Sequence, residues 1–194
     1  MYPRGNMADQ GKLSDYEDLI RSWAGRLDLI SPGDLDRLHE RHIADSLRAL
    51  ELVLDAPEGP CIDVGSGAGL PGIPLAIASG RRWRLLEPRS KRAAFLDEVV
   101  RTLELDCEVV RLTAQVAARD PRFGHAHALA TARALAPPRV AFELLSPLVA
   151  PGCRAVVFHG PDAELPASAE RSAPGLATIV VPGHHPSLPR EEQD

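Results

Sequence analysis

The chain has 194 residues, of which 44% are hydrophobic and 25% charged, and its formal net charge is −5 at pH 7. This length and composition predict one globular domain with a substantial core, and the acidic balance disfavours a strongly basic nucleic-acid binder. No apolar run approaches the roughly 20 residues that span a bilayer, and residues 1–12 lack the hydrophobic core of a signal peptide, so we expect a cytoplasmic protein without a membrane span.

The cysteines and histidines do not form a recognisable metal or disulfide pattern. Cys61, Cys107 and Cys153 are far apart and include no C-x-x-C pair. They are typical of small apolar core residues in a reducing cytoplasm. The close histidine pairs at 39/42 and 184/185 lack enough partners for a zinc site, so no metal is expected.

Two helices are predicted at the start of the chain. Apolar residues recur at helical spacing between Leu13 and Leu27. Ser31 as a cap and Pro32 in the first turn predict the start of a second helix. Its expected buried stripe consists of Leu35, Leu38, Ile43, Leu47, Leu50 and Leu54. We therefore assign residues 1–55 to an N-terminal helical extension.

Residues 56–181 alternate between strand-like and helix-like segments. Strands are predicted at 61–64, 83–87, 108–112, 128–131, 154–158 and 177–181, with helices over about 91–103 and from near residue 137. Strands separated by helices imply an α/β domain with a mostly parallel sheet covered on both faces. Residues 182–194, rich in Pro, His and Glu, are predicted to form a disordered tail.

The first predicted strand runs into a turn with glycine at alternate positions, Gly65, Gly67 and Gly69. Glycine lets the backbone turn tightly and approach a ligand more closely than a Cβ atom allows. The second predicted strand ends in Glu87, about twenty residues past the turn, where a βαβ nucleotide-binding fold holds a ribose. This combination predicts a nucleotide-type cofactor; a turn used only for close packing is the alternative.

The residues around the turn favour one adenosine cofactor over another. A dinucleotide loop requires glycine where this chain has Leu70, and the Asp63 carboxylate would repel a pyrophosphate. S-adenosylmethionine carries a ribose, an ammonium and a sulfonium but no phosphate, so carboxylates at Asp63 and Glu87 suit it. These residues disfavour a nicotinamide oxidoreductase.

Two clusters of basic residues stand out against the acidic background. One consists of Arg81, Arg82, Arg84, Arg89, Lys91 and Arg92, and the other of Arg37, His39, Arg41, His42 and Arg48. Either cluster is able to neutralise phosphates, and a solvated surface is an equally good interpretation of each.

Four segments together resemble a known family. They are the glycine turn with its Leu-Pro-Gly-Ile-Pro extension (63–75), Arg-His-Ile-Ala-Asp-Ser-Leu (41–47), Leu-Glu with Lys-Arg-Ala-Ala-Phe-Leu (86–87 and 91–96), and Ala-Arg-Ala (132–134). Between about Trp23 and Gly160 the chain is similar to the small-subunit rRNA methyltransferase G family, also called glucose-inhibited division protein B.

The resemblance implies a class I S-adenosylmethionine-dependent methyltransferase with a Rossmann-like fold. It implies methyl transfer to N7 of a guanine in 16S rRNA of the small ribosomal subunit. On this basis Gly65 and Leu70 would line the cofactor pocket, Ala114 and Gln115 would lie beside the adenine, and Arg133 would face the pocket. The full set of predicted cofactor residues is Asp63, Gly65, Gly67, Gly69, Leu70, Glu87, Ala114, Gln115 and Arg133, with Arg133 also the candidate catalytic residue.

The chain departs from the family pattern in four places. The tryptophan-led N-L-T segment is Leu27-Asp-Leu-Ile-Ser31, the acidic residue beside the adenine is Gln115, and the K-G pair after the fifth strand is His159-Gly160. The usual final strand has no evident counterpart after Val181. A methyltransferase acting on another RNA or a small molecule, and a noncatalytic cofactor-binding homologue, therefore stand as alternatives.

The residues present are compatible with methylation of a ring nitrogen. Guanine N7 carries a lone pair and no proton, so methyl transfer to it needs orientation rather than a general base. The Asn/Asp-Pro-Pro-aromatic segment typical of amine methylation is replaced by Thr131-Ala-Arg-Ala134. We expect Arg133 to contact an RNA phosphate or a carboxylate, with a structural ion pair as the alternative. For His42 near Asp45, a structural hydrogen bond is favoured over a catalytic role.

Overall fold

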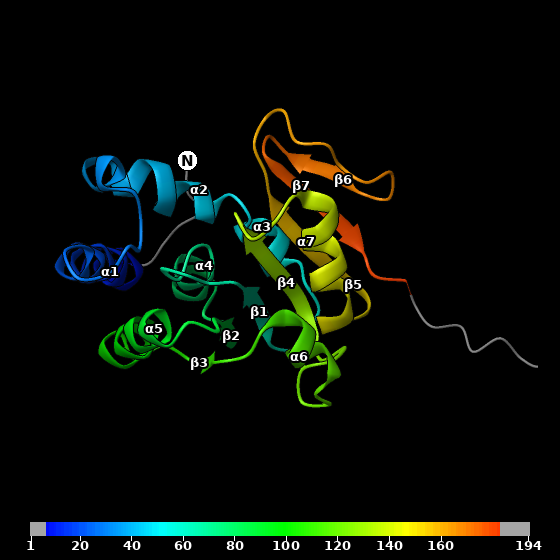
Figure 1. The fold of residues 1–194 in the computed structure, drawn as a ribbon, viewed down its shortest axis with the longest axis horizontal. Helices are drawn as coiled ribbons and strands as arrows, with labels where there is room; N and C mark the ends of the chain where they lie inside the picture. The colour runs from blue at the N-terminus through cyan, green and yellow to red at the C-terminus, as the bar shows by residue number, and fades with distance from the viewer. Residues whose placement is uncertain (1–6, 183–194) are drawn as a thin grey trace, which may run out of the picture.

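A computed structural model describes residues 7–182 of the chain, and within this range the strands form one seven-stranded sheet (Figure 1). The strands are β1 Cys61–Val64, β2 Trp83–Leu86, β3 Cys107–Val110, β4 His127–Arg133, β5 Val149–Phe158, β6 Glu170–Ala173 and β7 Leu176–Val180. Their order is β3-β2-β1-β4-β5-β7-β6. The first five are parallel, while β7 is antiparallel to both β5 and β6. The predicted α/β fold with a mostly parallel sheet is confirmed.

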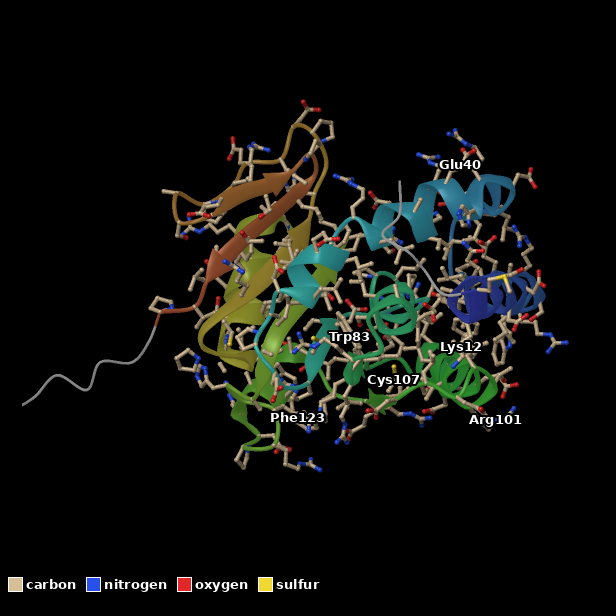
Figure 2. All side chains as sticks on the ribbon, turned by 180° about the vertical axis from the view of Figure 1, so that it is seen from behind. Lys12, Glu40, Trp83, Arg101, Cys107 and Phe123 are labelled. Carbon is tan, nitrogen blue, oxygen red and sulfur yellow. The ribbon has the colours of Figure 1, made fainter. Side chains whose placement is uncertain are left out.

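Helices cover both faces of this sheet (Figure 1). The helices are α1 Met7–Ala24, α2 Ala44–Leu47, α3 Leu50–Leu54, α4 Gly72–Ser79, α5 Ser90–Thr102, α6 Ala114–Arg119 and α7 Pro138–Leu145, with short turns η1 Pro32–Arg37, η2 His39–Ile43 and η3 Ser146–Leu148. Helices α1 to α5 pack on the sheet face that presents Leu85 and Trp83, and α6 and α7 pack on the face of Ile62 and Val64. Trp83 is fully buried near the centre of the molecule (Figure 2).

The N-terminal segment is part of the same packed unit. Tyr16 and Ile20 of α1 are fully buried in a cluster with Ile73 of α4 and Phe95 of α5. The helical extension predicted for residues 1–55 therefore contributes apolar side chains to the cover of the sheet. Residues 183–194, which make up almost all of the predicted tail, lie outside the described residues.

The second predicted helix is wrong as a continuous element. The chain instead forms the 3₁₀ turn η1, the π-type turn η2, and the short helices α2 and α3. The apolar stripe explains the break, because Leu38 and Ile43 are both fully buried although five residues separate them. A regular α-helix places such residues on different faces, whereas a π-type turn keeps them together. Ser31 makes no side-chain capping bond, and Leu54 is 49% exposed.

The expectation that the last strand of the sheet is missing is also wrong. Strand β7 follows a tight turn at Gly175, whose φ is +71°, and pairs with β6, an element that the sequence did not reveal. Three of the four residues of β6 are exposed, so the strand lacks the apolar run by which the others were found. The antiparallel hairpin β6–β7 therefore completes the sheet before Val181.

Candidate functional site

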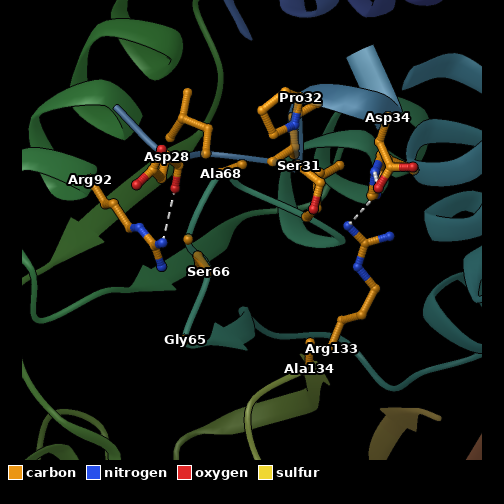
Figure 3. A pocket seen from close by; sticks show the side chains of 15 residues that line it. Asp28, Ser31, Pro32, Asp34, Gly65, Ser66, Ala68, Arg92, Arg133 and Ala134 are labelled. Carbon is orange, nitrogen blue, oxygen red and sulfur yellow. Dashed lines mark hydrogen bonds and ion pairs between the residues drawn. The ribbon is translucent and has the colours of Figure 1, made fainter. Parts of the chain in front are cut away.

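A cavity of about 520 Å³ lies where β1 and β4 end, at the carboxyl edge of the parallel strands (Figure 3). This is the edge at which open α/β sheets bind ligands. Three segments wall it: the glycine turn, the connection between α1 and η1, and the first turn of α5. The lining residues are Asp28, Leu29, Ile30, Ser31, Pro32, Asp34, His42, Gly65, Ser66, Gly67, Ala68, Leu70, Arg92, Arg133 and Ala134.

The glycine turn adopts a backbone that other residues rarely adopt. Gly65, Gly67 and Gly69 have φ values of +72°, +57° and +92°. Gly65, Gly67 and Leu70 line the cavity, as predicted, but Gly69 faces the protein interior. A Cβ atom at Gly69 would lie 2.6 Å from Ile73 and 3.0 Å from the Tyr16 hydroxyl. Gly69 thus permits close packing, whereas Gly65 and Gly67 present backbone to the cavity.

Asp63 lies beneath the turn and does not line the cavity. Its carboxylate is 1% exposed and accepts hydrogen bonds from the Thr131 hydroxyl at 2.8 Å and from the Gly72 N–H at 3.3 Å. Burial raises the pKa of Asp63 to about 6, and these hydrogen bonds oppose the rise. In this structure Asp63 ties β1 to β4 and to the start of α4, and so fixes the geometry of the turn.

Glu87 lies directly behind the glycine turn. One carboxylate oxygen accepts a hydrogen bond from Gly67 N–H at 3.0 Å, and the other accepts one from Arg89 N–H at 2.8 Å. Its residue is 3% exposed and is not among those that line the cavity. Each carboxylate oxygen has a second lone pair, so Glu87 retains the capacity to accept hydrogen bonds from a ligand beside Gly67.

Ala114 and Gln115 lie away from the cavity, at the start of α6. Ala114 is buried in the core on the α6–α7 face, and Gln115 is exposed. The α6 helix begins here because the Thr113 side chain accepts a hydrogen bond from Val116 N–H.

The N-terminal segment supplies a wall of the cavity that sequence reasoning missed. The Tyr16 hydroxyl donates a hydrogen bond of 2.6 Å to the Ala68 carbonyl, and the Trp23 ring packs edge-on against Phe95 at 5.6 Å. Farther along, Arg92 donates to the Asp28 carbonyl at 3.0 Å (Figure 3). A polar connection between two helices, ending in a proline, was the available signal, since such connections often carry binding residues.

Arg133 stands at the end of β4 and reaches into the cavity (Figure 3). One guanidinium nitrogen is 3.1 Å from His42 Nδ1, and another is 3.5 Å from the Asp45 carboxylate. Both sequence interpretations of Arg133 therefore hold, because the side chain lines the cavity and also forms an ion pair. The next residue, Ala134, has a φ of +53°, an unusual value for alanine that marks a constrained backbone beside Arg133.

The His42 ring links Arg133 to the wall. Its Nε2 atom is 3.5 Å from the Asp34 carboxylate, and its pKa is lowered mainly by burial and next by the charge of Arg133. A neutral ring accepts a hydrogen bond from Arg133 at Nδ1 and directs Nε2–H toward Asp34. His42 thus pairs with Arg133 rather than with Asp45, which the sequence had suggested as its neighbour.

The cavity lining contains charges of both signs. Carboxylates come from Asp28 and Asp34, and guanidinium groups come from Arg92 and Arg133. Such a lining suits a zwitterionic ligand with a further positive charge. Residues 7–182 contain no group of His, Cys, Asp and Glu side chains that could hold a metal ion, and no helix in that range is long and apolar enough to cross a membrane.

Comparison with known proteins gives a consistent result. The family described as rRNA small subunit methyltransferase G matches residues 9–181. Proteins named ribosomal RNA small subunit methyltransferase G from Granulibacter bethesdensis and Gluconobacter oxydans are each 40% identical to this chain, over 79% and 71% of it and 69% and 68% of their own lengths. A namesake from Rhodopseudomonas palustris is 34% identical over 92% of this chain and 75% of its own length.

Solved structures share the fold at low identity. A protein from Corynebacterium glutamicum aligns over 94% of this chain and 93% of its own, with a TM-score of 0.58 and 12% identity. Geranyl diphosphate C-methyltransferase from Streptomyces coelicolor, solved with S-adenosyl-L-homocysteine, aligns over 74% of this chain and 64% of its own, with a TM-score of 0.54 and 16% identity.

Proposed function

This chain belongs to the rRNA small subunit methyltransferase G family, and from that premise we propose that it transfers a methyl group from S-adenosylmethionine to N7 of a guanine in 16S rRNA. The observation that carries the proposal is the cavity at the end of β1, where the glycine turn presents its backbone beside carboxylate and guanidinium groups. A small-subunit substrate implies a location in the cytoplasm.

The residues present fit the cofactor. A Cβ atom at Gly65 would lie 2.7 Å from Leu135, so only glycine leaves that side of the turn open to a ligand. Glu87 is one hydrogen bond from Gly67 and is placed to bind a ribose hydroxyl, while Asp28 and Asp34 are placed to attract the cationic groups. When bound, S-adenosylmethionine supplies an electrophilic methyl group on a sulfonium.

The protein has to orient the guanine and exclude water, because N7 brings its own lone pair. Orientation of two reactants is worth roughly 7–11 kcal/mol. Arg133 is the side chain best placed to hold the RNA or the cofactor carboxylate, since it lines the cavity and is oriented by His42. A planar guanidinium binds a carboxylate or phosphate through two parallel hydrogen bonds. No residue is required to remove a proton from N7.

The N-terminal segment belongs to this mechanism. We propose that residues 1–55 form a helical extension whose connection from Asp28 to Pro32 covers the cofactor, and that residues 56–181 form the methyltransferase domain. Support comes from the contact between Arg92 and the Asp28 carbonyl, which closes one side of the cavity.

Methylation of small ribosomal subunits from a strain that lacks the gene tests the proposal. We expect labelled methyl groups on one guanine N7, located by chemical cleavage at the modified base. Subunits from a strain that contains the gene serve as the control and should accept no label. Label on no RNA, or binding of NAD in preference to S-adenosylmethionine by calorimetry, would refute the proposal.

Site variants test the assignment of residues. Glu87→Ala should weaken cofactor binding by at least tenfold, whereas Gln115→Ala should leave it within twofold, because Gln115 is exposed away from the cavity. An equal effect of the two substitutions would show that the cofactor lies elsewhere.

A further inference from the structure

Most cations of this acidic protein are neutralised by a neighbouring carboxylate. In the N-terminal cluster, Arg37 pairs with Glu40, Arg41 with Asp34 at 2.5 Å, and Arg48 with Asp45 at 2.7 Å. A paired guanidinium attracts a phosphate weakly, since its field is cancelled by its partner and screened by salt. This cluster is therefore a poor candidate for binding RNA.

Two members of the other cluster are also engaged within the protein. Arg81 donates hydrogen bonds to the carbonyls of Val53, Ala56, Pro57 and Gly59, and so fixes the connection between α3 and β1. Arg84 pairs with Glu108 at 3.2 Å and donates to the Arg122 carbonyl. Both residues stabilise the fold.

Three cations differ from these. Within the described residues, the exposed side chains of Arg26, Arg89 and Lys91 have no carboxylate within 4.0 Å. Arg89 and Lys91 lie within one turn of Arg92, which lines the cavity. Arg26 lies in the turn between Trp23, which packs on Phe95, and Asp28, which bonds to Arg92. These three residues, here called the α5 rim, therefore surround one side of the cavity mouth.

We propose that the α5 rim binds backbone phosphates of a single-stranded rRNA segment on either side of the target guanine. This inference rests on the proposed function and adds the direction from which the substrate docks. The rest of the protein carries the net negative charge and repels RNA, so three unpaired cations beside the cavity orient the strand toward it. Phosphate contacts position the strand, and the cavity selects the base.

The paired variants Arg89→Gln/Lys91→Gln and Arg101→Gln/Arg111→Gln test this inference. Both remove two positive charges, but Arg101 pairs with Glu98 and Arg111 with Asp97, and Arg101 lies at the periphery of the molecule (Figure 2). The rim variant should bind small ribosomal subunits more weakly, while its affinity for S-adenosylmethionine stays within twofold. Each lost contact to a single strand lowers the salt slope by about 0.7, so the advantage of wild type over the rim variant should shrink roughly sevenfold between about 50 mM and about 200 mM salt.

The control variant should retain the wild-type slope and the wild-type KM for the subunit. If wild type methylates the subunit and the two variants behave alike, the α5 rim is not the RNA surface and the inference is overturned, although the proposed function stands. If wild type neither binds nor methylates the subunit, the proposed function fails, and this inference falls with it.

Discussion

The hydroxyl of Tyr16 in the N-terminal helix donates a buried hydrogen bond of 2.6 Å to the carbonyl of Ala68 in the glycine turn, across 52 residues of sequence. This bond joins a helix that precedes the methyltransferase domain to the loop that we propose binds the cofactor. It gives the N-terminal extension a direct means of fixing the turn.

Tyr16→Phe should therefore affect both stability and cofactor binding. The substitution leaves a buried carbonyl without its donor, which costs about 1–3 kcal/mol of the free energy of unfolding. S-adenosylmethionine affinity should fall several-fold because the turn is no longer held. Chemical denaturation and calorimetry measure the two effects. Ser22→Ala on the same helix removes an exposed hydroxyl that bonds to the Leu19 carbonyl, and it should change neither quantity; equal effects of the two variants would contradict the role of Tyr16.

Gly69→Ala tests the close packing behind the turn. Its Cβ atom would lie 2.6 Å from Ile73 Cγ1 and 3.1 Å from Leu96, and its φ of +92° is strained for alanine. We expect a loss of more than about 3 kcal/mol, typical of overpacking combined with backbone strain. Gly80→Ala is the matched control, because Gly80 has a φ of +63° at the end of α4 but open space around it. Its cost should be about 1 kcal/mol, and thermal unfolding that gives the two variants the same stability would rule out the packing argument.

The pH dependence of activity should depend on His42. Its pKa is lowered from 6.5 mainly by burial and by Arg133, with Asp34 opposing and Arg41 adding to the decrease, so the ring is neutral at pH 7 and accepts from Arg133. Protonation, which occurs only below pH 6.5, removes that acceptor and repels the guanidinium. We therefore expect kcat/KM to be constant above pH 6.5 and to fall as the pH is lowered further.

The variant His42→Gln separates this effect from general acid inactivation. A glutamine oxygen still accepts a hydrogen bond from Arg133 but does not titrate, so the decline below pH 6.5 should be reduced while activity at neutral pH is largely kept. A His42→Gln profile that falls in parallel with that of wild type would assign the decline to another group.

The parts of this fold that sequence predicted best are those specified by local apolar runs. Strand β1 was predicted with the bounds that the structure gives, and β2 ends one residue before Glu87, as its position behind the glycine turn required. Strand β6 was missed because its residues are mostly exposed and pair only through the backbone. Periodicity detects burial and not hydrogen-bonded pairing at a sheet edge.

The site shows a similar division. Gly65, Gly67, Leu70 and Arg133 were predicted and line the cavity, since motif positions locate the ends of β1 and β4. The wall from Asp28 to Pro32 was not predicted, because it depends on how α1 packs against α5. The partners of the arginines were equally inaccessible to sequence, as most of these ion pairs join residues whose proximity only the tertiary structure determines.

Two buried groups predict an unusual dependence of stability on pH. Burial raises the pKa of Asp63 from 3.8 to about 6, so the folded state holds that proton longer than the unfolded state, and stability is lost as the pH rises toward about 6. Burial lowers the pKa of His127 from 6.5 to about 4, so the unfolded state takes up that proton first, and stability is lost as the pH falls from 6.5 toward 4. Each effect amounts to roughly 3 kcal/mol, and between about pH 4 and pH 6 the two nearly cancel.

Asp63→Asn should uncover the histidine effect. An asparagine oxygen can accept from Gly72 N–H while its amide donates to the Thr131 hydroxyl, so the bonds beneath the turn are kept without a buried charge. Its free energy of unfolding should match or exceed that of wild type at neutral pH and then fall steeply from pH 6.5 to pH 4. His127→Asn should show the opposite slope over this range, whatever its cost in absolute stability, because only the Asp63 effect remains. Denaturation curves of the three proteins that run parallel from pH 4 to pH 6.5 would show that neither group is perturbed, and Asp63 would then have to be ionised in the folded state throughout that range.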